Sequence, residues 1–260
     1  MLTLIAESKT MTACADSVSS SLYAAHTPEF EAEADAIMQS IGSLTVQELA
    51  AAVKISLPMA QRFKLMIHDF PNKSTGAKAI EAFTGVVFRA LDRRSLSAGD
   101  MNRLYGLVRI VSSLYGLLRP DDIIKPYRLD FTTPLAPEGK RMAAYWRENV
   151  TDAILQYTRV NSCSNLLNLM PGDAERCIDL KRVEAEAKMW KAEFLEVKPG
   201  GIAATPTANR LKTLRGTLLR QIITENITEP QQLIGIESDH YIAEMKPGCD
   251  NTIIFTTVAG

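Results

Sequence analysis

Arginine and lysine side chains gather in two segments where their charge could bind an anion. The cations of the first segment surround the turn at Pro120 and are Arg119, Lys125 and Arg128. Those of the second segment lie on a predicted helix and are Arg210, Lys212, Arg215 and Arg220. Phosphate can approach the main chain closely at a neighbouring glycine, here Gly116 or Gly216, so both segments suit a phosphodiester backbone. A solvated basic helix would show the same spacing, and this alternative stays open.

Two adjacent carboxylates, Asp121 and Asp122, lie within the first segment. Neighbouring side chains point apart in a strand and diverge by about 100° in a helix, so this pair is poorly placed as a general acid and base. Capping of a turn, with pairing to an arginine, is the favoured interpretation. Tyr115 and Tyr127 could stack on nucleobases, although Tyr115 falls on an apolar stripe and is better explained as a core residue.

Sequence motifs of the common reaction centres are missing. There is no glycine-rich dinucleotide or phosphate loop, no Gly-x-Ser-x-Gly elbow and no His-Glu-x-x-His pair. The chain has three histidines and four cysteines, and none of them shows the spacing of a zinc site: His26, His68, His240, Cys14, Cys163, Cys177 and Cys249. We therefore expect no catalytic residue of a known class, no metal and no cofactor.

Composition limits the classes of partner. A chain of 260 residues with 46% hydrophobic residues can bury a large core, and we expect residues 1–260 to form one domain. A net charge of -1 means that any affinity for nucleic acid must come from local patches. No segment approaches the roughly 20 apolar residues of a membrane span, and residues 2–6 are too short for a signal peptide. These features predict a cytoplasmic protein with reduced cysteines.

Periodicity and capping residues predict the elements that position these side chains. A short buried strand at residues 2–5 would place Lys9 close to a strand end, where side chains can project into a cleft. Helices are expected at residues 27–40, 45–53, 56–70, 97–118, 139–157 and 208–224. Strands are expected at residues 165–169, 190–197, 202–205 and 251–258. Strands and helices do not alternate regularly, so the predicted class is α+β, a mixed sheet surrounded by helices.

The run from residue 114 to 129, Leu-Tyr-Gly-Leu-Leu-Arg-Pro-Asp-Asp-Ile-Ile-Lys-Pro-Tyr-Arg-Leu, resembles the signature of the YaaA-type peroxide-stress family. We call it the signature run. The similarity extends over nearly the whole chain, through Phe83-Thr84-Gly85-Val86-Val87-Phe88, Tyr145-Trp146, Asn168-Leu169, Arg215-Gly216 and Arg220. The resemblance implies a family-specific α+β fold with a basic cleft and a helix-hairpin-helix-like element, for which residues 110–122 are the candidate segment. It also implies cleft residues, which are Lys9, Arg119, Asp122, Tyr127, Arg128, Lys212, Arg215 and Arg220.

The chain departs from the family pattern at three places. Ala6-Glu7-Ser8 stands where the family usually has Ser-Pro-Ala before the retained Lys9-Thr10. Residues 169–174 have lost a serine and a tyrosine and carry the shorter acid Asp173, and Arg210 replaces an expected tyrosine. All three departures fall where polar groups of the cleft would be.

Three functional hypotheses follow. The leading one is binding of double-stranded or branched DNA in the peroxide-stress response, without sequence preference, through Lys9, Arg119, Lys125, Arg128, Lys212, Arg215 and Arg220. The second is an enzyme acting on a small phosphorylated or nucleobase-like ligand in a pocket formed by Lys9, Arg119, Asp122 and Arg128. The third is a diverged paralogue that has lost the activity of the cleft.

Overall fold

A mixed β-sheet of eight strands organises the chain, in a computed structural model that describes residues 1–12, 26–72, 75–238 and 240–258. The strand order is β4-β3-β1-β6-β7-β10-β9, with β8 paired to β7, and β2 and β5 form a separate two-stranded sheet. The strands are β1 Leu2–Ala6, β2 Ala77–Lys78, β3 Val108–Ser112, β4 Gly116–Leu118, β5 Ile123–Ile124, β6 Asn165–Asn168, β7 Lys188–Val197, β8 Ala203–Ala204, β9 Ile242–Met245 and β10 Thr252–Val258.

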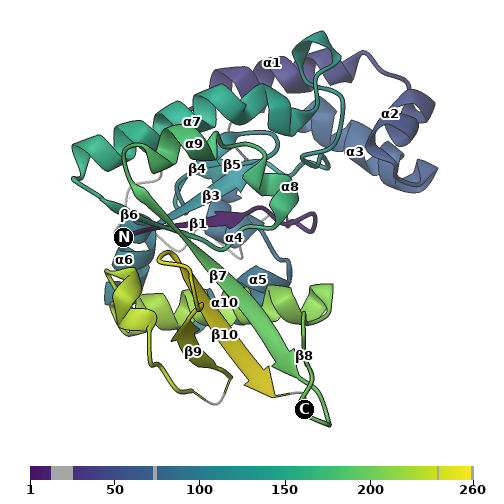
Figure 1. Cartoon of the computed structure of the whole chain (residues 1–260). Coiled ribbons are helices and arrows are strands. Elements are labelled where there is room, and N and C mark those ends of the chain that lie inside the picture. The colour runs from purple at the N-terminus through teal and green to yellow at the C-terminus, as the bar shows by residue number, and fades with distance from the viewer. Residues whose placement is uncertain (13–25, 73–74, 239, 259–260) are drawn as a thin grey trace.

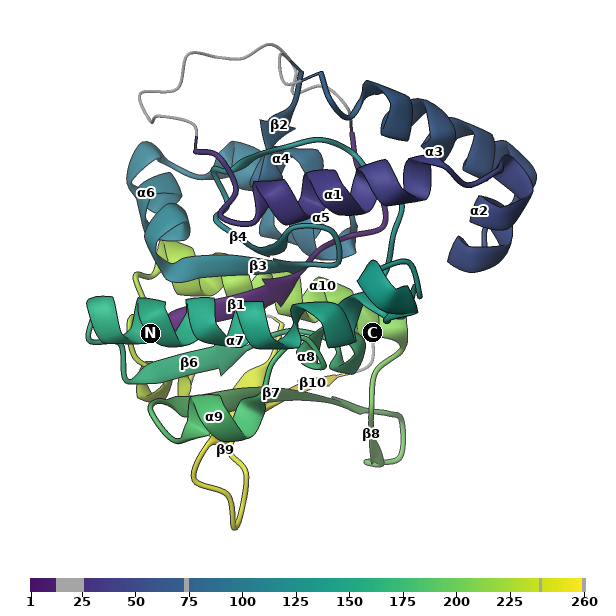
Figure 2. The same cartoon turned by 90° about the horizontal axis from the view of Figure 1, so that it is seen from above.

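Helices cover both faces of this sheet. In Figure 2, α7 lies on the near side of β1 and β6, and α10 lies on the far side. Figure 1 shows α5 and α10 together on one face and α7 with α9 on the other. The helices are α1 Glu31–Gly42, α2 Val46–Val53, α3 Leu57–Asp69, α4 Ala79–Ala82, α5 Val86–Leu91, α6 Ala98–Leu107, α7 Met142–Val160, α8 Gly172–Glu175, α9 Leu180–Glu184 and α10 Ala208–Thr224.

Strand β1 lies at the centre of the core. All five of its residues are buried, and it pairs in parallel with β3 on one side and β6 on the other. A strand covered on both faces needs an unbroken apolar run, which explains Leu2, Leu4 and Ile5. The predicted strand at residues 2–5 is confirmed, and its carboxyl end directs residues 7–10 out of the sheet.

The α+β expectation needs correction, because the central strands β3, β1, β6, β7 and β10 are all parallel. Such a sheet belongs to the α/β class, although the antiparallel strands β4, β8 and β9 make it mixed, as predicted. The alternation was hard to see because the crossover from β1 to β3 is long and contains six helices among the described residues.

The predicted helix at residues 97–118 is wrong in its second half. Its first half forms α6, which begins with a capping box between Ser97 and Asp100. Residues 108–118 instead form the β3–β4 hairpin, in which Gly116 has a φ of +68°. Burial of β4 and of most of β3 removes the alternation of a half-exposed strand, and the apolar residues of these strands fit a helical stripe as well. Residues 110–122 therefore do not form the helix-hairpin-helix-like element for which they were the candidate segment.

The other predicted elements are confirmed within a few residues at their ends. The helices expected at residues 45–53 and 56–70 are α2 and α3, and Thr45 makes the capping box of α2 with Glu48. The hairpin expected around residues 198–201 joins β7 to β8. The helix at residues 208–224 is α10, and the final strand is β10.

Candidate functional site

A cavity of about 310 Å³ lies at the carboxyl ends of β1 and β6. The chain leaves β1 toward β3 and leaves β6 toward β7, so the connections after two adjacent strands run in opposite directions. Ligands of open α/β sheets bind in the crevice at such a switch point. The charged residues that line the cavity are Glu7, Lys9, Arg89, Asp130, Asp173, Lys212 and Arg215.

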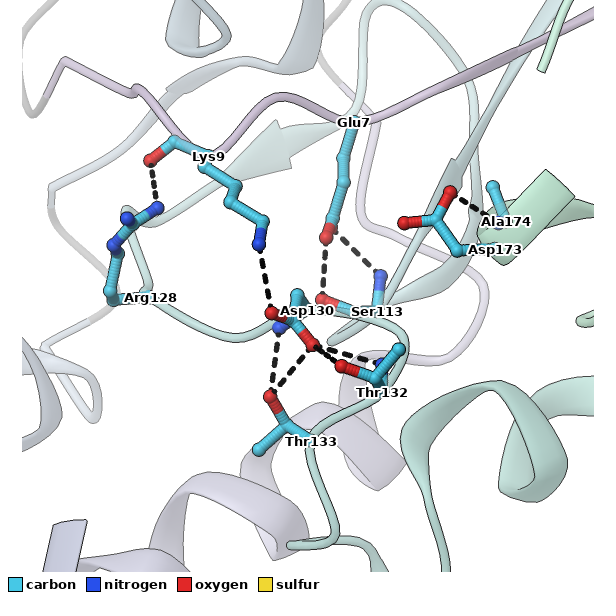
Figure 3. A network of polar contacts seen from close by, with 9 residues as sticks. All are labelled: Glu7, Lys9, Ser113, Arg128, Asp130, Thr132, Thr133, Asp173 and Ala174. Atoms are coloured by element: carbon cyan, nitrogen blue, oxygen red, sulfur yellow. Dashed lines mark hydrogen bonds and ion pairs between the residues drawn. The ribbon is translucent and has the colours of Figure 1, made fainter. Parts of the chain in front are cut away.

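Lys9 and Asp130 form an ion pair in the cavity wall (Figure 3). Lys9 Nζ lies 2.9 Å from Asp130 Oδ2, and the side chain of Lys9 is 57% exposed. Burial disfavours the charged form of Asp130, but hydrogen bonds from Lys9 and Thr132 outweigh burial and lower its pKa to about 2. Arg128 donates to the Lys9 carbonyl oxygen over 2.9 Å. Lys9 is therefore held in place and still reaches solvent.

Glu7 is the other carboxylate that follows β1. Its Oε2 accepts hydrogen bonds from the Ser113 amide, at 2.8 Å, and from the Tyr127 hydroxyl, while its Oε1 accepts from Ser113 Oγ at 2.6 Å. Burial raises the pKa of Glu7 from the ordinary 4.5 to about 7, although these hydrogen bonds oppose the rise. Both protonation states are therefore accessible near neutral pH.

The loop after β6 forms the opposite wall. The side chain of Asn168 holds this loop: its Oδ1 accepts from the Met170 amide at 2.9 Å, and its Nδ2 donates to Glu175 at 2.8 Å. The loop then places Asp173, at the start of α8, in the cavity wall. In Figure 3, Glu7 lies between Lys9 and Asp173.

Helices α5 and α10 form the third wall and carry its cations. Lys212 is exposed and Arg215 is partly buried; burial lowers the pKa of Arg215, and the charge of Asp173 partly offsets that effect. The helices approach closely because Gly216 has no side chain: a Cβ there would lie 2.3 Å from the Val87 carbonyl oxygen. The contact between α5 and α10 therefore fills the space beside Gly216, and a phosphate has no room to approach the main chain there.

The sequence-derived cations are only partly brought together. Lys9, Lys212 and Arg215 line the cavity, and Arg128 contacts Lys9. Arg119 lies at the amino end of β3, because β4 runs back along β3 from the hairpin. Gly116 packs on Trp146, where a Cβ would lie 2.8 Å from the indole. The predicted roles in DNA binding stay predictions, but the seven cations do not form one cluster.

Arg119 lines a second cavity, of about 410 Å³, with Arg109, Asp122 and Tyr157. The buried Asp122 carboxylate accepts from the Arg119 amide at 2.7 Å, and burial first, then the Asp121 charge, raises its pKa to about 7. The Arg109 guanidinium lies 4.7 Å from the centre of the Tyr157 ring. Asp122 therefore caps its own turn, as the adjacent carboxylates suggested.

Lys125 and Arg220 each donate hydrogen bonds to backbone carbonyl oxygens. Arg220 donates to Leu91, at 2.9 Å, and to Asp92, at 3.1 Å, at the end of α5. Lys125 is 6% exposed and donates to the Asp69 carboxylate, at 2.6 Å, and to the carbonyl oxygens of Asp69 and Asn72 beyond the end of α3. Contacts of this kind stabilise the fold.

Replacing Lys125 with methionine is expected to lower the free energy of unfolding by about 2 kcal/mol, because the carbonyl groups lose a charged donor. Urea unfolding followed by circular dichroism measures this loss. Lys140→Met is the matched control: it removes an exposed ion pair with Glu138 and should leave the free energy of unfolding almost unchanged. If Lys125→Met left stability unchanged but reduced the salt dependence of DNA binding, the structural role would be refuted.

The described residues lack two further kinds of site. No group of three or more histidine, cysteine, aspartate or glutamate side chains in this part of the chain could hold a metal ion. No described helix is long and apolar enough to cross a bilayer.

Comparison with known proteins agrees with the resemblance. The sequence model of the family described as "Peroxide stress protein YaaA" matches residues 1–246. The chain belongs to the YaaA peroxide stress protein family. A UPF0246 protein of Burkholderia mallei is 32% identical to this YaaA-family chain over 239 residues, covering 90% of each protein. A UPF0246 protein of Burkholderia thailandensis is 30% identical over 237 residues, again covering 90% of each.

Sequence reasoning missed four residues of the cavity in this YaaA-family chain. Glu7, Asp130, Asp173 and Arg89 line it but were not among the candidate site residues. The position of Glu7, directly after a buried strand and two residues before Lys9, was the available signal. No comparable signal marks Arg89, because its position depends on how α5 packs against α10.

Proposed function

We propose that this YaaA-family chain binds a phosphate-bearing ligand in the cavity at the ends of β1 and β6, as part of a response to peroxide. The observation that carries the proposal is the placement of Lys9, Lys212 and Arg215 around a cavity at the switch point of the sheet. A phosphate is the anion best matched by several cations of this kind.

The size and mixed charge of the cavity favour a small ligand. A volume of about 310 Å³ is at the lower end of the range for small-molecule sites, roughly 300–1,000 Å³. Glu7 and Asp173 add hydrogen-bond acceptors that phosphate alone does not need. A mononucleotide-sized phosphate ester, with donor groups beside its phosphate, supplies both kinds of partner.

DNA is the second candidate. The exposed side chains of Lys9 and Lys212 favour it, because they can reach a phosphodiester backbone outside the cavity. Binding of this kind needs no ligand inside the cavity and should weaken steeply with salt.

Calorimetric titration with AMP tests the proposal. Arg215→Ala and Lys212→Ala are each expected to weaken AMP binding by about 10-fold or more, as removal of a charged hydrogen bond does. Arg182→Ala is the matched control, since Arg182 is an exposed arginine that pairs with Asp152 on α7, and it should leave binding unchanged. A wild-type protein that does not bind AMP would refute the small-ligand proposal.

A duplex of about 20 base pairs forms the second arm of the test. If DNA is the ligand, the slope of log affinity against log salt should fall by about one in Lys9→Ala and by about one in Lys212→Ala. Salt-insensitive binding that both variants retain would exclude the phosphate-contact form of DNA binding.

A further inference from the structure

Glu7 differs from the other carboxylates of the cavity in its partners. Asp130 forms an ion pair with Lys9. The charge of Asp173 raises the pKa of Arg215 and so partly offsets the effect of burial. The hydrogen-bond donors to the Glu7 carboxylate in the described part of the chain are Ser112, Ser113 and Tyr127, which carry no charge. A carboxylate in a ligand cavity that is held by neutral donors keeps the ability to accept a proton.

We propose that Glu7 exchanges a proton with the ligand in this cavity, and that the ligand is a phosphate ester which also carries an O–H or N–H group. This inference rests on the proposed function and extends it from binding to acid–base chemistry. Lys212 and Arg215 hold the phosphate, while Glu7 faces the group that gives up its proton.

The two oxygens of Glu7 are not equivalent. Oε2 accepts from the Ser113 amide and the Tyr127 hydroxyl, whereas Oε1 accepts from Ser113 Oγ. Oε1 therefore has the greater remaining capacity to accept. In the exchange, the ligand's O–H or N–H bond breaks and its electron pair stays on the ligand. A new O–H bond then forms at Glu7, and the reverse step returns the proton.

Glu7 titrates near neutral pH, whereas the titratable groups described next, which surround it, do not. Tyr127 donates to its carboxylate and Cys177 interacts with its charge; burial raises the pKa of both well above their ordinary values, so neither releases a proton there. Asp130 is ionised, because its pKa is about 2. Burial holds the pKa of Glu7 near 7, where it can both take and return a proton.

Glutamate labelled with carbon-13 at Cδ provides the test, by magnetic resonance of the whole chain across pH. One carboxyl resonance is expected to titrate near pH 7, and it should be missing in Glu7→Gln. Tyr127→Phe, which removes one donor to the carboxylate, should move this midpoint to higher pH. That second variant also assigns the resonance if Glu7→Gln fails to fold.

Addition of the methyl ester of AMP then tests the exchange, because a phosphodiester does not itself titrate near pH 7. Saturating ester is expected to shift the midpoint by at least about half a pH unit, through its contact with Glu7. Binding of the ester without any shift would overturn this inference and leave the proposed function standing. A midpoint between pH 4 and 5 would also overturn it. Absence of AMP and ester binding would remove the proposed function and the inference with it.

Discussion

Replacing Trp146 with alanine is expected to lower the free energy of unfolding by about 3–5 kcal/mol. Its side chain is fully buried, with the ring centre 5.5 Å from that of Phe30 and 4.9 Å from that of Tyr145. Truncation would leave a large cavity beneath the β3–β4 hairpin. It would also leave the Ser113 carbonyl oxygen without its donor, since Trp146 Nε1 lies 2.8 Å away.

Urea unfolding followed by far-ultraviolet circular dichroism measures the effect of Trp146→Ala. Trp146→Phe serves as the control, because it keeps a six-membered aromatic ring while it loses the donor and the smaller ring of the indole, at an expected cost of about 1–3 kcal/mol. Similar losses in the two variants would indicate that the hydrogen bond, and not the packing, carries the stability. A loss below about 1 kcal/mol for the alanine variant would contradict the packing argument.

Replacing Gly216 with alanine is expected to cost about 3 kcal/mol, despite the higher helix propensity of alanine. The new Cβ would lie 2.3 Å from the Val87 carbonyl oxygen and 2.7 Å from the Ala90 Cβ, so α5 and α10 must separate. Since these helices carry the cations of the cavity, AMP binding should weaken as well.

Gly106→Ala in α6 is the matched control for Gly216→Ala. No atom lies within 4 Å of the Cβ that alanine would add at Gly106, so only the helix propensity changes. That change should stabilise the protein by about 0.5–1 kcal/mol. If both alanine variants were stabilised, the close approach of α5 and α10 would not limit the side chain at residue 216.

Local signals in the sequence were sufficient to predict most of the helices and strands. Thr45 precedes α2 and makes its capping box with Glu48, whereas Ser56 precedes α3 without a side-chain cap hydrogen bond. The hairpin at residues 108–118 was missed because burial on all sides removes the alternation that identifies a strand. No local signal distinguishes such a strand from a buried helix.

The candidate site was harder to predict because it depends on contacts between distant segments. Glu7 meets Ser113 and Tyr127 only after β1 and β3 have paired. From the sequence, Ala6-Glu7-Ser8 looked like the loss of a family motif, whereas the structure places a buried carboxylate there. The signature run was interpreted as one site, yet its Gly116 pairs with Ser112 at the carboxyl end of β3, whereas its Arg119 lies at the amino end.

During synthesis of the chain, β1 cannot pair with β3 and β6 until both of these strands have been made. Leu2–Ala6 is largely apolar and is synthesised before both of its partners, Val108–Ser112 and Asn165–Asn168. At a translation rate of about 5–20 residues per second, β6 follows β1 by roughly 10–30 s. During that interval the future central strand has unpaired amide and carbonyl groups, which makes it a natural binding segment for a chaperone and a site where nascent chains can associate.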